Sequence, residues 1–310
     1  MKRVLLAGGA GFLGSHLTEQ LLCEGFEVTV VDDFSSGRKS NLASVQERIK
    51  VIEGNIASFS HKTPFDFVLN FASRASRAEW EAYPTDVSLA NSVGSYNLIR
   101  IALESKARYL YASSSEVYGD PEIIPTPETY VGKTDSVGPR SPYVESKRFG
   151  ETLLKSFERQ YGLDGVIIRL FNTYGPRMRG GDFYGRVIDR FIGQACLGTP
   201  LTVYGDGSQT RAFTYVEDTV AGVITVMKNG VSGEVYNIGS DHETRIIDLA
   251  RSVIRATKSN STTVFSQLPR DDAKRRAAEI SKVKKLGWLP RVDLETGLRR
   301  TVGWVHNLPA

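Results

Sequence analysis

The stretch VLLAGGAGFLGSH, residues 4–16, decides the fold of this chain. Its first four residues are apolar and predict a short buried strand, and an apolar pattern through Leu17–Cys23 predicts a helix directly after the glycines. The spacing Gly8-x-x-Gly11-x-x-Gly14 permits a tight turn, close approach of the backbone to a diphosphate, and close packing of helix against strand. Because a helix N-terminus offers N–H groups and partial positive charge to phosphates, the stretch predicts a dinucleotide site.

Strand patterns recur along the next 150 residues, with helical patterns between them. They lie at Glu27–Val31, Val51–Glu53, Phe67–Phe71, Tyr109–Ala112 and Val166–Leu170. This alternation predicts an α/β fold with a parallel, doubly wound sheet. We expect residues 1–172 to form the dinucleotide-binding domain, with later segments returning to it. Residues 173–310, in which loops rich in Gly and Arg alternate with short helices and strands, are expected to form mainly a smaller substrate-binding lobe.

Composition narrows the function classes. The 310 residues are 41% hydrophobic and 24% charged, with a net charge of +4. That charge is too small, and too evenly spread, to predict nucleic-acid binding. No apolar run is long enough to cross a bilayer, and the N-terminus leads straight into a strand, so we expect a cytoplasmic protein. Cys23 and Cys196 lack the spacing of metal ligands, so no metal site is predicted, and both are expected to be buried.

Residues at strand ends supply further cofactor contacts. Asp32 ends the second strand, where a carboxylate can bind both ribose hydroxyls of an adenosine and repel a 2′-phosphate. This favours NAD over NADP, although the nearby Arg38 weakens that preference. Asn55 and Ile56 follow the third strand and Ala72 follows the fourth, so the adenine and the rest of the cofactor are expected there. Ordinary loop chemistry at strand ends also explains these three residues.

Tyr143 and Lys147 lie four residues apart on a predicted helix and therefore share one face. An ammonium group beside a phenol stabilises the phenolate, so the tyrosine can act as a base. The run Ser113-Ser-Ser-Glu116 follows a buried strand, where a hydroxyl can hydrogen-bond the substrate oxygen that Tyr143 deprotonates. This combination suits hydride transfer to and from a nicotinamide.

The sequence resembles the extended short-chain dehydrogenases/reductases of the NAD-dependent epimerase/dehydratase family, which share a Rossmann-type sheet and act on nucleotide sugars. The UDP-glucuronate decarboxylases are the most similar in pattern. The motifs are GGAGFLGSH at 8–16, SEVYGDP at 115–121, GPRSPYVESKR at 138–148, NTYGPRM at 172–178, LTVYGDGSQTRAF at 201–213 and DDAKRRAAEI at 271–280. The resemblance implies oxidation at C4, loss of carbon dioxide and re-reduction of the sugar, with NAD regenerated.

The resemblance also assigns roles to residues. The implied catalytic residues are Tyr143, Lys147, Ser114, Glu116 and Arg276. The implied cofactor contacts are Gly8, Gly11, Phe12, Leu13, Gly14, Asp32, Asn55, Ile56, Ala72, Ser113, Tyr143 and Lys147. The implied contacts to the UDP-sugar are Ser76, Arg77, Asn172, Arg186, Tyr204, Arg211 and Arg276. Members usually form homodimers, and the stretches near 91–105 and 145–160 have suitable apolar faces.

One segment departs from the decarboxylase pattern. Arg74 and Arg77 stand where those enzymes have prolines, so they are candidate ligands for a sugar carboxylate, and they leave the step after oxidation open. A UDP-sugar 4-epimerase is the main alternative, since it uses the same tyrosine, lysine and serine but needs no counterpart of Glu116. A nucleotide-sugar 4,6-dehydratase needs an Asp-Glu pair, and Ser115 replaces the aspartate. A dinucleotide sensor without catalysis is disfavoured, because Tyr143 and Lys147 are both present.

Overall fold

A seven-stranded sheet of order β11-β6-β5-β4-β1-β2-β3 organises the first part of the molecule. Its strands are β1 (Arg3–Ala7), β2 (Glu27–Asp32), β3 (Lys50–Glu53), β4 (Phe67–Asn70), β5 (Arg108–Ser114), β6 (Gly165–Leu170) and β11 (Val235–Ile238). Neighbouring strands from β3 to β6 are parallel. Residues Val4–Ala7 of β1 are fully buried, as expected for a strand covered on both faces. The doubly wound parallel sheet predicted from the sequence is confirmed.

The computed structural model of the chain describes residues 1–178, 186–268 and 274–307. Its contacts divide the chain into two units. The first unit contains residues 1–117, 134–170 and 220–236, and the second contains 118–133, 171–219 and 237–310. Residues 271–273 of the motif at 271–280 lie outside the described residues.

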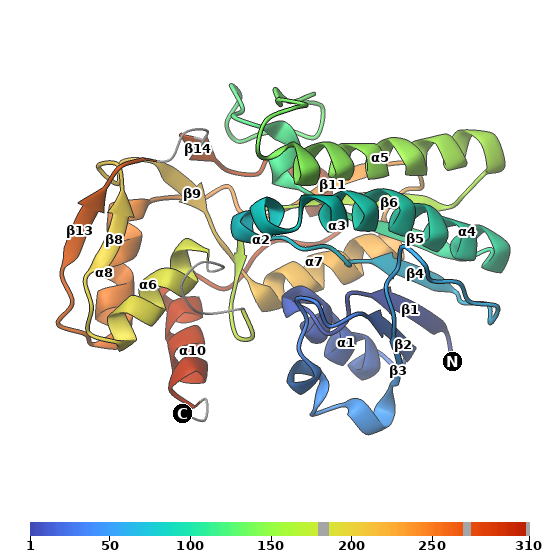
Figure 1. Ribbon diagram of the computed structural model, residues 1–310, viewed down its shortest axis with the longest axis horizontal. Helices are drawn as coiled ribbons and strands as arrows, with labels where there is room; N and C mark the ends of the chain where they lie inside the picture. Colours follow the sequence, from blue (N-terminus) through green and yellow to red (C-terminus); the bar gives the residue numbers. More distant parts are fainter. Residues whose placement is uncertain (179–185, 269–273, 308–310) are drawn as a thin grey trace. The chain divides into compact units, whose positions relative to one another are not determined.

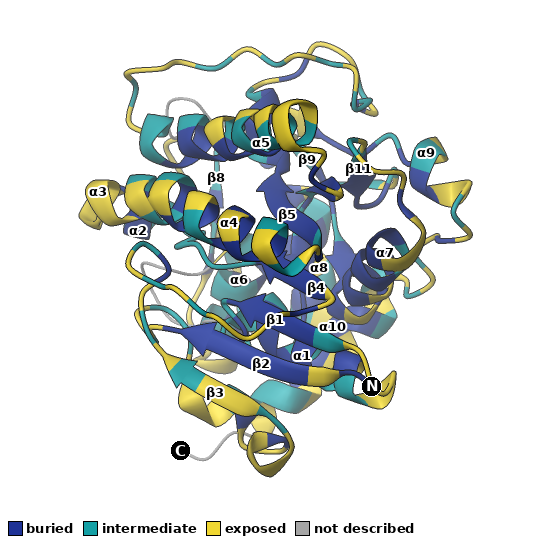
Figure 2. Cartoon of the chain, turned by 90° about the vertical axis from the view of Figure 1, so that its right-hand side faces the viewer, coloured by how far each residue is buried: buried dark blue, intermediate teal, exposed yellow. Residues whose placement is uncertain are grey.

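Helices cover both faces of the large sheet. Figures 1 and 2 show α3, α4 and α5 along one face, with α1 and α7 on the other. The helices are α1 (Phe12–Cys23), α2 (Arg77–Ala82), α3 (Pro84–Leu89), α4 (Ser95–Ser105), α5 (Ser141–Tyr161) and α7 (Val216–Asn229). The buried residues of α5 include Tyr143, Val144, Lys147 and Leu154, which lie on one side of the helix. This amphipathic pattern fixes which face of α5 meets the sheet.

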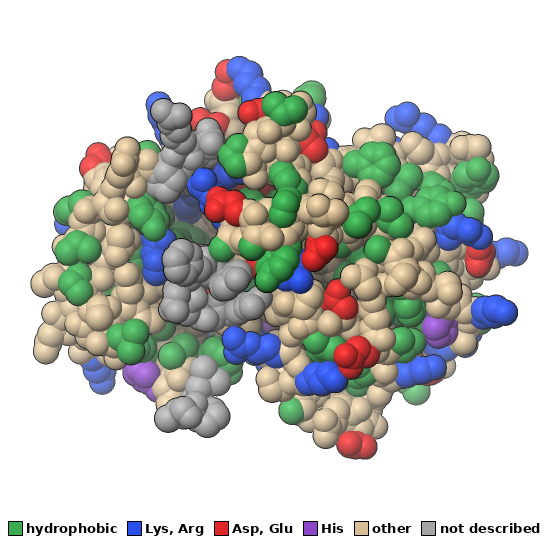
Figure 3. All heavy atoms as spheres, in the orientation of Figure 1, with side chains coloured by type: hydrophobic (Ala, Val, Ile, Leu, Met, Phe, Trp, Pro, Cys, Tyr) green, Lys and Arg blue, Asp and Glu red, His purple; other side chains and the backbone are tan. Residues whose placement is uncertain are grey.

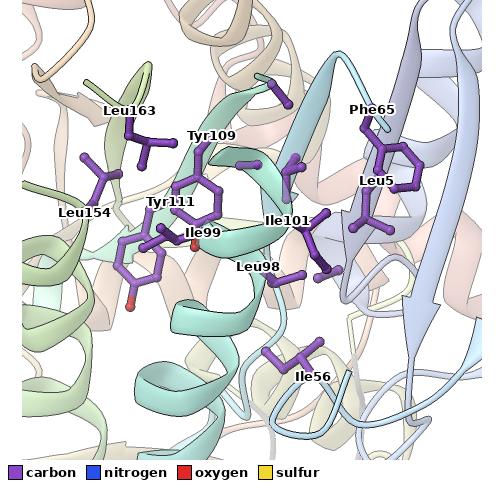
Figure 4. Close-up of a cluster of buried hydrophobic side chains, with 14 of the residues drawn as sticks. Leu5, Ile56, Phe65, Leu98, Ile99, Ile101, Tyr109, Tyr111, Leu154 and Leu163 are labelled. Carbon is purple, nitrogen blue, oxygen red and sulfur yellow. The ribbon is translucent and has the colours of Figure 1, made fainter. Parts of the chain in front are cut away.

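A large hydrophobic cluster of the first unit lies between the sheet and helices α4 and α5 (Figure 4). Leu98, Ile99 and Leu154 from the helices pack with Tyr109 and Tyr111 of β5. The Tyr109 hydroxyl accepts a hydrogen bond from Asn70 Nδ2 at 3.0 Å. Because this buried hydroxyl has a partner, Tyr109 can occupy the core at little cost.

The second unit combines short strands with several helices. The strands form the pairs β7 (Thr173–Tyr174) with β10 (Thr214–Tyr215) and β8 (Leu201–Tyr204) with β13 (Thr263–Ser266), and the sheet β12 (Glu243–Arg245), β9 (Thr210–Ala212) and β14 (Arg275–Arg276). The helices are α6 (Val187–Cys196), α8 (Ile246–Thr257), α9 (Ser281–Lys284) and α10 (Leu294–His306). Helix α8 contacts both α6 and α10 and supplies the buried side chains Ile246, Leu249 and Val253.

Two expectations about surfaces can be compared with the structure. Among the described residues, no helix is long and apolar enough to cross a membrane. The expectation that both cysteines are buried is wrong, because Cys23 and Cys196 are exposed free thiols. Each is the last residue of its helix, α1 and α6 respectively. The apolar stripe that buries the middle of each helix does not protect its final residue.

Candidate active site

A cavity opens at the carboxyl ends of β1, β2 and β4, where the strand order of the sheet reverses. In open α/β sheets this reversal is the usual place for a ligand. The cavity has an empty volume of about 610 Å³, part of it open to solvent. Its lining is Gly8, Gly11, Val31, Asp32, Asp33, Ser35, Ser36, Gly37, Gly54, Asn55, Ile56, Phe71, Ala72, Ser73, Arg74, Asp86 and Ala90. Of the residues expected to hold the cofactor, Gly8, Gly11, Asp32, Asn55, Ile56 and Ala72 are among these.

The glycine turn brings the start of α1 against this cavity. A Cβ atom on Gly14 would lie 2.0 Å from the Gly8 carbonyl oxygen, so only glycine permits this packing of helix on turn. Gly11 is the N-cap of α1 and brings no side chain to accept the first N–H groups of the helix. Phe12 and Leu13 are the first two residues of α1. The backbone N–H groups of this turn can therefore bind phosphate oxygens.

Asp32 is 7% exposed and is held by the backbone around it. Its carboxylate accepts hydrogen bonds from the Ala10 N–H at 2.8 Å and the Phe34 N–H at 2.9 Å. Burial raises the pKa of Asp32, and the two N–H bonds partly oppose that rise. A carboxylate has about four acceptor sites, so both oxygens can still accept bonds from ribose hydroxyls. The side chain of Arg38 is exposed.

Tyr143 and Lys147 lie in the first two turns of α5 and are 6% and 3% exposed. The Lys147 ammonium donates a hydrogen bond to the Ala112 carbonyl oxygen at 2.7 Å. The same nitrogen lies 5.8 Å from the centre of the Tyr143 ring. Gly150 permits the helix to approach this closely, because a Cβ atom there would lie 2.2 Å from the Tyr111 hydroxyl. The structure thus brings together the expected phenol and ammonium.

Burial lowers the pKa of Lys147 to about 7, and the Glu151 carboxylate opposes that shift. The native side chain is neutral between about pH 7 and the ordinary value of 10.5, whereas the unfolded chain stays protonated in that range. The unfolded state therefore binds more protons, and the contribution of Lys147 to the free energy of unfolding rises with pH across this window.

Lys147→Met tests this behaviour. In NAD-free protein, we expect the free energy of unfolding of wild type, relative to the variant, to increase from about pH 7 to about pH 9, by up to roughly 1.4 kcal/mol per pH unit. Urea unfolding at matched pH values measures both proteins, and their difference removes the titration of other groups. Parallel pH curves for the two proteins would mean that Lys147 keeps its ordinary pKa.

The three candidate side chains at the carboxyl end of β5 and in the turn that follows it have different partners. The Ser113 hydroxyl donates to Glu151 Oε1 at 2.5 Å, and Glu151 also forms two hydrogen bonds with Arg169. The Ser114 hydroxyl accepts the Glu116 N–H at 3.2 Å. Glu116 is the second residue of the 3₁₀ turn Ser115–Tyr118 and lies 3.4 Å from the guanidinium of Arg140, the N-cap of α5. Sequence reasoning missed Glu151, Arg140 and Arg169.

In the segment after β4, Arg74 and Arg77 were expected to be ligands for a sugar carboxylate, and both instead pair with nearby glutamates. Arg74 lines the cavity at the strand ends and pairs with Glu79 at 3.5 Å. Arg77, expected to contact substrate, is 41% exposed and pairs with Glu81 at 3.0 Å. Ser76 caps α2, since its hydroxyl accepts the Glu79 N–H and donates to the Glu79 carboxylate. The Ser-x-x-Glu spacing at 76–79 was a visible signal of such a cap.

Two buried arginines lie side by side in the second unit. Arg211 of β9 is directly opposite Arg276 of β14 in a parallel pair, so both side chains are on the same face of the small sheet. They are 8% and 5% exposed. Arg211 donates to the Thr210 carbonyl oxygen at 2.8 Å, and Arg276 is 3.5 Å from that of Gly119. Guanidinium groups on one face can each form bidentate hydrogen bonds with phosphate oxygens.

The other expected substrate contacts also belong to the second unit. Asn172 precedes β7 and its carbonyl oxygen accepts the Thr214 N–H at 2.9 Å. Arg186 is the N-cap of α6 and donates to the Thr173 carbonyl oxygen at 3.4 Å. Burial raises the pKa of the nearby Asp189 to about 7, and Arg186 opposes that rise. The Arg190 guanidinium lies 4.5 Å above the ring of Tyr204.

Comparison with known proteins gives consistent results. The model of the NAD dependent epimerase/dehydratase family matches residues 4–239. A UDP-glucuronic acid decarboxylase 1 from Xenopus tropicalis is 42% identical over 309 residues, covering 99% of this chain and 72% of that protein. The solved UDP-glucose 4-epimerase of Thermotoga maritima, with UDP-glucose, is 31% identical, covers 98% of both chains and has a TM-score of 0.90. The dTDP-glucose 4,6-dehydratase DesIV of Streptomyces venezuelae, with NAD bound, is 28% identical with a TM-score of 0.89, covering 98% of this chain and 97% of that one.

Proposed function

The chain belongs to the NAD dependent epimerase/dehydratase family, and from that premise we propose that it converts UDP-glucuronate to UDP-xylose and carbon dioxide. The identity of about 40% to decarboxylases over nearly the whole chain supports this activity. The observation that carries the proposal is the Glu116 carboxylate, set directly after β5 and paired with Arg140. A 4-epimerase has no chemical use for that carboxylate, whereas decarboxylation requires proton transfer at C5.

NAD is the proposed cofactor. Three features of the cavity at the strand ends fit NAD. The turn packs so closely that a Cβ on Gly14 has no room, and the Gly11 N-cap leaves backbone N–H groups for phosphates. The Asp32 carboxylate faces the same space. The buried Asp32 carboxylate would repel a 2′-phosphate, which favours NAD over NADP. When bound, NAD supplies the acceptor for a hydride from C4 of the sugar and returns that hydride at the end of the cycle.

The first step assigned to the protein is removal of the proton from the C4 hydroxyl. Tyr143 takes this proton as a phenolate, and the Lys147 ammonium stabilises the phenolate. The Ser114 hydroxyl donates a hydrogen bond to the same C4 oxygen. Burial of Lys147 places its pKa near neutral pH, so the proton that it must hold is easily lost as the pH rises. We therefore expect turnover to decline on the alkaline side through loss of the Lys147 ammonium.

Loss of carbon dioxide follows from the chemistry of the oxidised sugar. A ketone at C4 makes the uronate a β-keto acid, so the electrons of the C5–carboxylate bond pass into a C4 enolate as carbon dioxide leaves. A proton then adds at C5, and the ketone is reduced again with Tyr143 returning its proton. We assign to Glu116 the handling of protons at C5, with Arg140 holding its carboxylate in place.

The uridine diphosphate is assigned to the second unit. Arg211 and Arg276 present two guanidinium groups on one face of β9 and β14, which suits a diphosphate or a carboxylate. Arg186 adds a third cation and Asn172 an amide. Tyr204 offers a ring for the uracil. Arg276, the counterpart of the family's arginine, is also assigned to the catalytic group, while Ser76 and Arg77 remain weaker candidates because α2 and Glu81 already engage them.

A UDP-sugar 4-epimerase is the second candidate, favoured by the likeness to the epimerase of Thermotoga maritima. Such an enzyme acting on a uronate must hold the carboxylate so that carbon dioxide cannot leave. Arg74 and Arg77 were the residues expected to do so. Their pairing with Glu79 and Glu81 argues against that use.

Incubation of the purified protein with UDP-glucuronate and NAD tests the proposal. We expect release of carbon dioxide and formation of UDP-xylose in equal amounts, with no net reduction of NAD. UDP-galacturonate without gas would overturn the proposal in favour of epimerisation. A matched incubation with UDP-glucose, which has no carboxylate to lose, is the control.

We place the enzyme in the cytoplasm, where the free thiols Cys23 and Cys196 would stay reduced, and propose that it is a homodimer. Hydrophobic side chains gather on the surface over α4 and α5 (Figure 3). Val93, Tyr96, Phe149 and Tyr161 are between 40% and 54% exposed. Two copies of this helix pair would bury these side chains against each other.

Phe149→Glu is expected to reduce the mass in solution from that of two chains to that of one, because it places a charge in the apolar patch. Sedimentation equilibrium measures the mass. Phe265→Glu is the matched control, since Phe265 is 61% exposed on β13 of the second unit, outside the patch. An unchanged dimer in the Phe149 variant would exclude this surface as the interface.

A further inference from the structure

Trp80 lies directly against the proposed catalytic tyrosine. The indole and the Tyr143 ring are stacked with centres 4.3 Å apart and planes 11° apart. Trp80 is 5% exposed and Tyr143 is 6% exposed, so water separates neither ring from its neighbour. Val87, Val144 and Ala75 complete this small apolar cluster, which is separate from the cluster between the sheet and helices α4 and α5. One whole face of the Tyr143 ring is therefore covered by an indole.

The indole itself is fixed by the segment that follows β4. Its Nε1–H donates a hydrogen bond to the Arg74 carbonyl oxygen at 3.1 Å. Helix α2, which carries Trp80, is capped by Ser76 through the Glu79 N–H, and the buried Glu79 carboxylate pairs with Arg74. Rotation of the indole would break a buried hydrogen bond and leave its donor unsatisfied. The indole of Trp80 is thus held in one orientation.

A fixed indole matters at this position because Tyr143 must hold its hydroxyl in one place for proton transfer. Proton transfer requires the phenol oxygen within about 2.6–3.2 Å of the substrate oxygen. Tyr143 is the third residue of α5, and rotation of its ring about the Cα–Cβ bond would sweep the hydroxyl away from that point. Lys147 supplies the positive charge beside the phenol. Because it lies on the same helix as Tyr143, it does not hold the ring from the opposite side. The indole stacked on the ring restricts it to one plane.

We propose that Trp80 is a positioning residue that fixes the Tyr143 phenol for proton transfer at C4. The proposal rests on the proposed role of Tyr143 as the base. It assigns to the segment 74–80 a role in catalysis that does not involve contact between Trp80 and the substrate. It also explains why the Arg74 backbone and the Ser76 cap matter: they hold the indole.

Trp80→Leu is the test, with Trp288→Leu as the matched control. Trp288 is 4% exposed and its Nε1–H also donates to a backbone carbonyl oxygen, that of Asp218, at 2.9 Å, but it belongs to the second unit. We expect Trp80→Leu to lower kcat about 100-fold through misplacement of the base, with the KM for the sugar nucleotide and the content of bound NAD unchanged. Trp288→Leu should lower the melting temperature comparably and leave kcat near that of wild type. Trp80→Phe, which keeps a stacked ring, should recover most of the rate.

A double-mutant cycle separates positioning from packing. If Trp80 acts through the phenol, Trp80→Leu should cost nothing further in the residual rate of a Tyr143→Phe protein. Equal losses of kcat in the Trp80 and Trp288 variants, or a further loss in the Tyr143→Phe background, would overturn the proposal. All rates are measured as ratios to wild type on whichever sugar nucleotide wild type converts. A wild type that releases no carbon dioxide thus refutes the decarboxylase function, and only the ratios refute the role of Trp80.

Discussion

Tyr143→Phe is expected to lower kcat for carbon dioxide release by roughly 10²–10⁴-fold, the usual contribution of a positioned general base. The substitution removes only the hydroxyl. The ring stays buried and stacked on Trp80, so the fold should persist and the protein should retain NAD. Rate, NAD content and melting temperature should be measured on the same preparation, because a loss of rate with the other two intact isolates the chemistry.

Tyr109→Phe is the matched control for that variant. Tyr109 is also a fully buried tyrosine of the first unit, and its hydroxyl accepts a hydrogen bond from Asn70. We expect it to lose about 1 kcal/mol of stability, the net worth of one hydrogen bond, with little effect on turnover. Near-normal turnover of Tyr143→Phe would refute the assignment of the phenol as the base.

Glu116→Ala is expected to separate the two halves of the reaction. In the proposed mechanism, oxidation at C4 depends on Tyr143, Lys147 and Ser114, so a single turnover should still reduce the bound nicotinamide at nearly the wild-type rate. Release of carbon dioxide should fall by roughly 10²–10³-fold, because proton transfer at C5 loses its positioned group. Rapid-mixing absorbance of reduced nicotinamide and trapping of carbon dioxide measure the two steps on one sample.

Two further variants are controls for this experiment. Glu116→Gln keeps the shape of the side chain and separates loss of charge from loss of packing beside Arg140. Glu145→Ala removes another carboxylate that pairs with an arginine, Arg148, but it lies on the other side of α5 from Tyr143. If oxidation and gas release fall equally in the Glu116 variants, Glu116 only supports the structure of the site.

The local sequence was sufficient to predict the strands and helices that carry the residues of the site. A four-residue apolar run, three glycines and an amphipathic helix could be read as β1, the turn and α1, and Asp32 could be placed at the end of β2. The i, i+4 spacing of Tyr143 and Lys147 was sufficient to place them on one face of α5. These features depend on periods of two or 3.6 residues, which are visible within a short window.

Only the tertiary structure decided which distant residues meet. Arg211 lies opposite Arg276 because of the register of β14 on β9, and Trp80 meets Tyr143 because α3, which follows α2 directly, packs against α5. The partner of Glu116 is Arg140, and that of the Ser113 hydroxyl is Glu151. The sequence determined the sheet, the glycine turn and the placement of Tyr143 and Lys147 on one helix face. Contacts across tens of residues are set by how faces pack and strands align, and no periodicity along the chain encodes that.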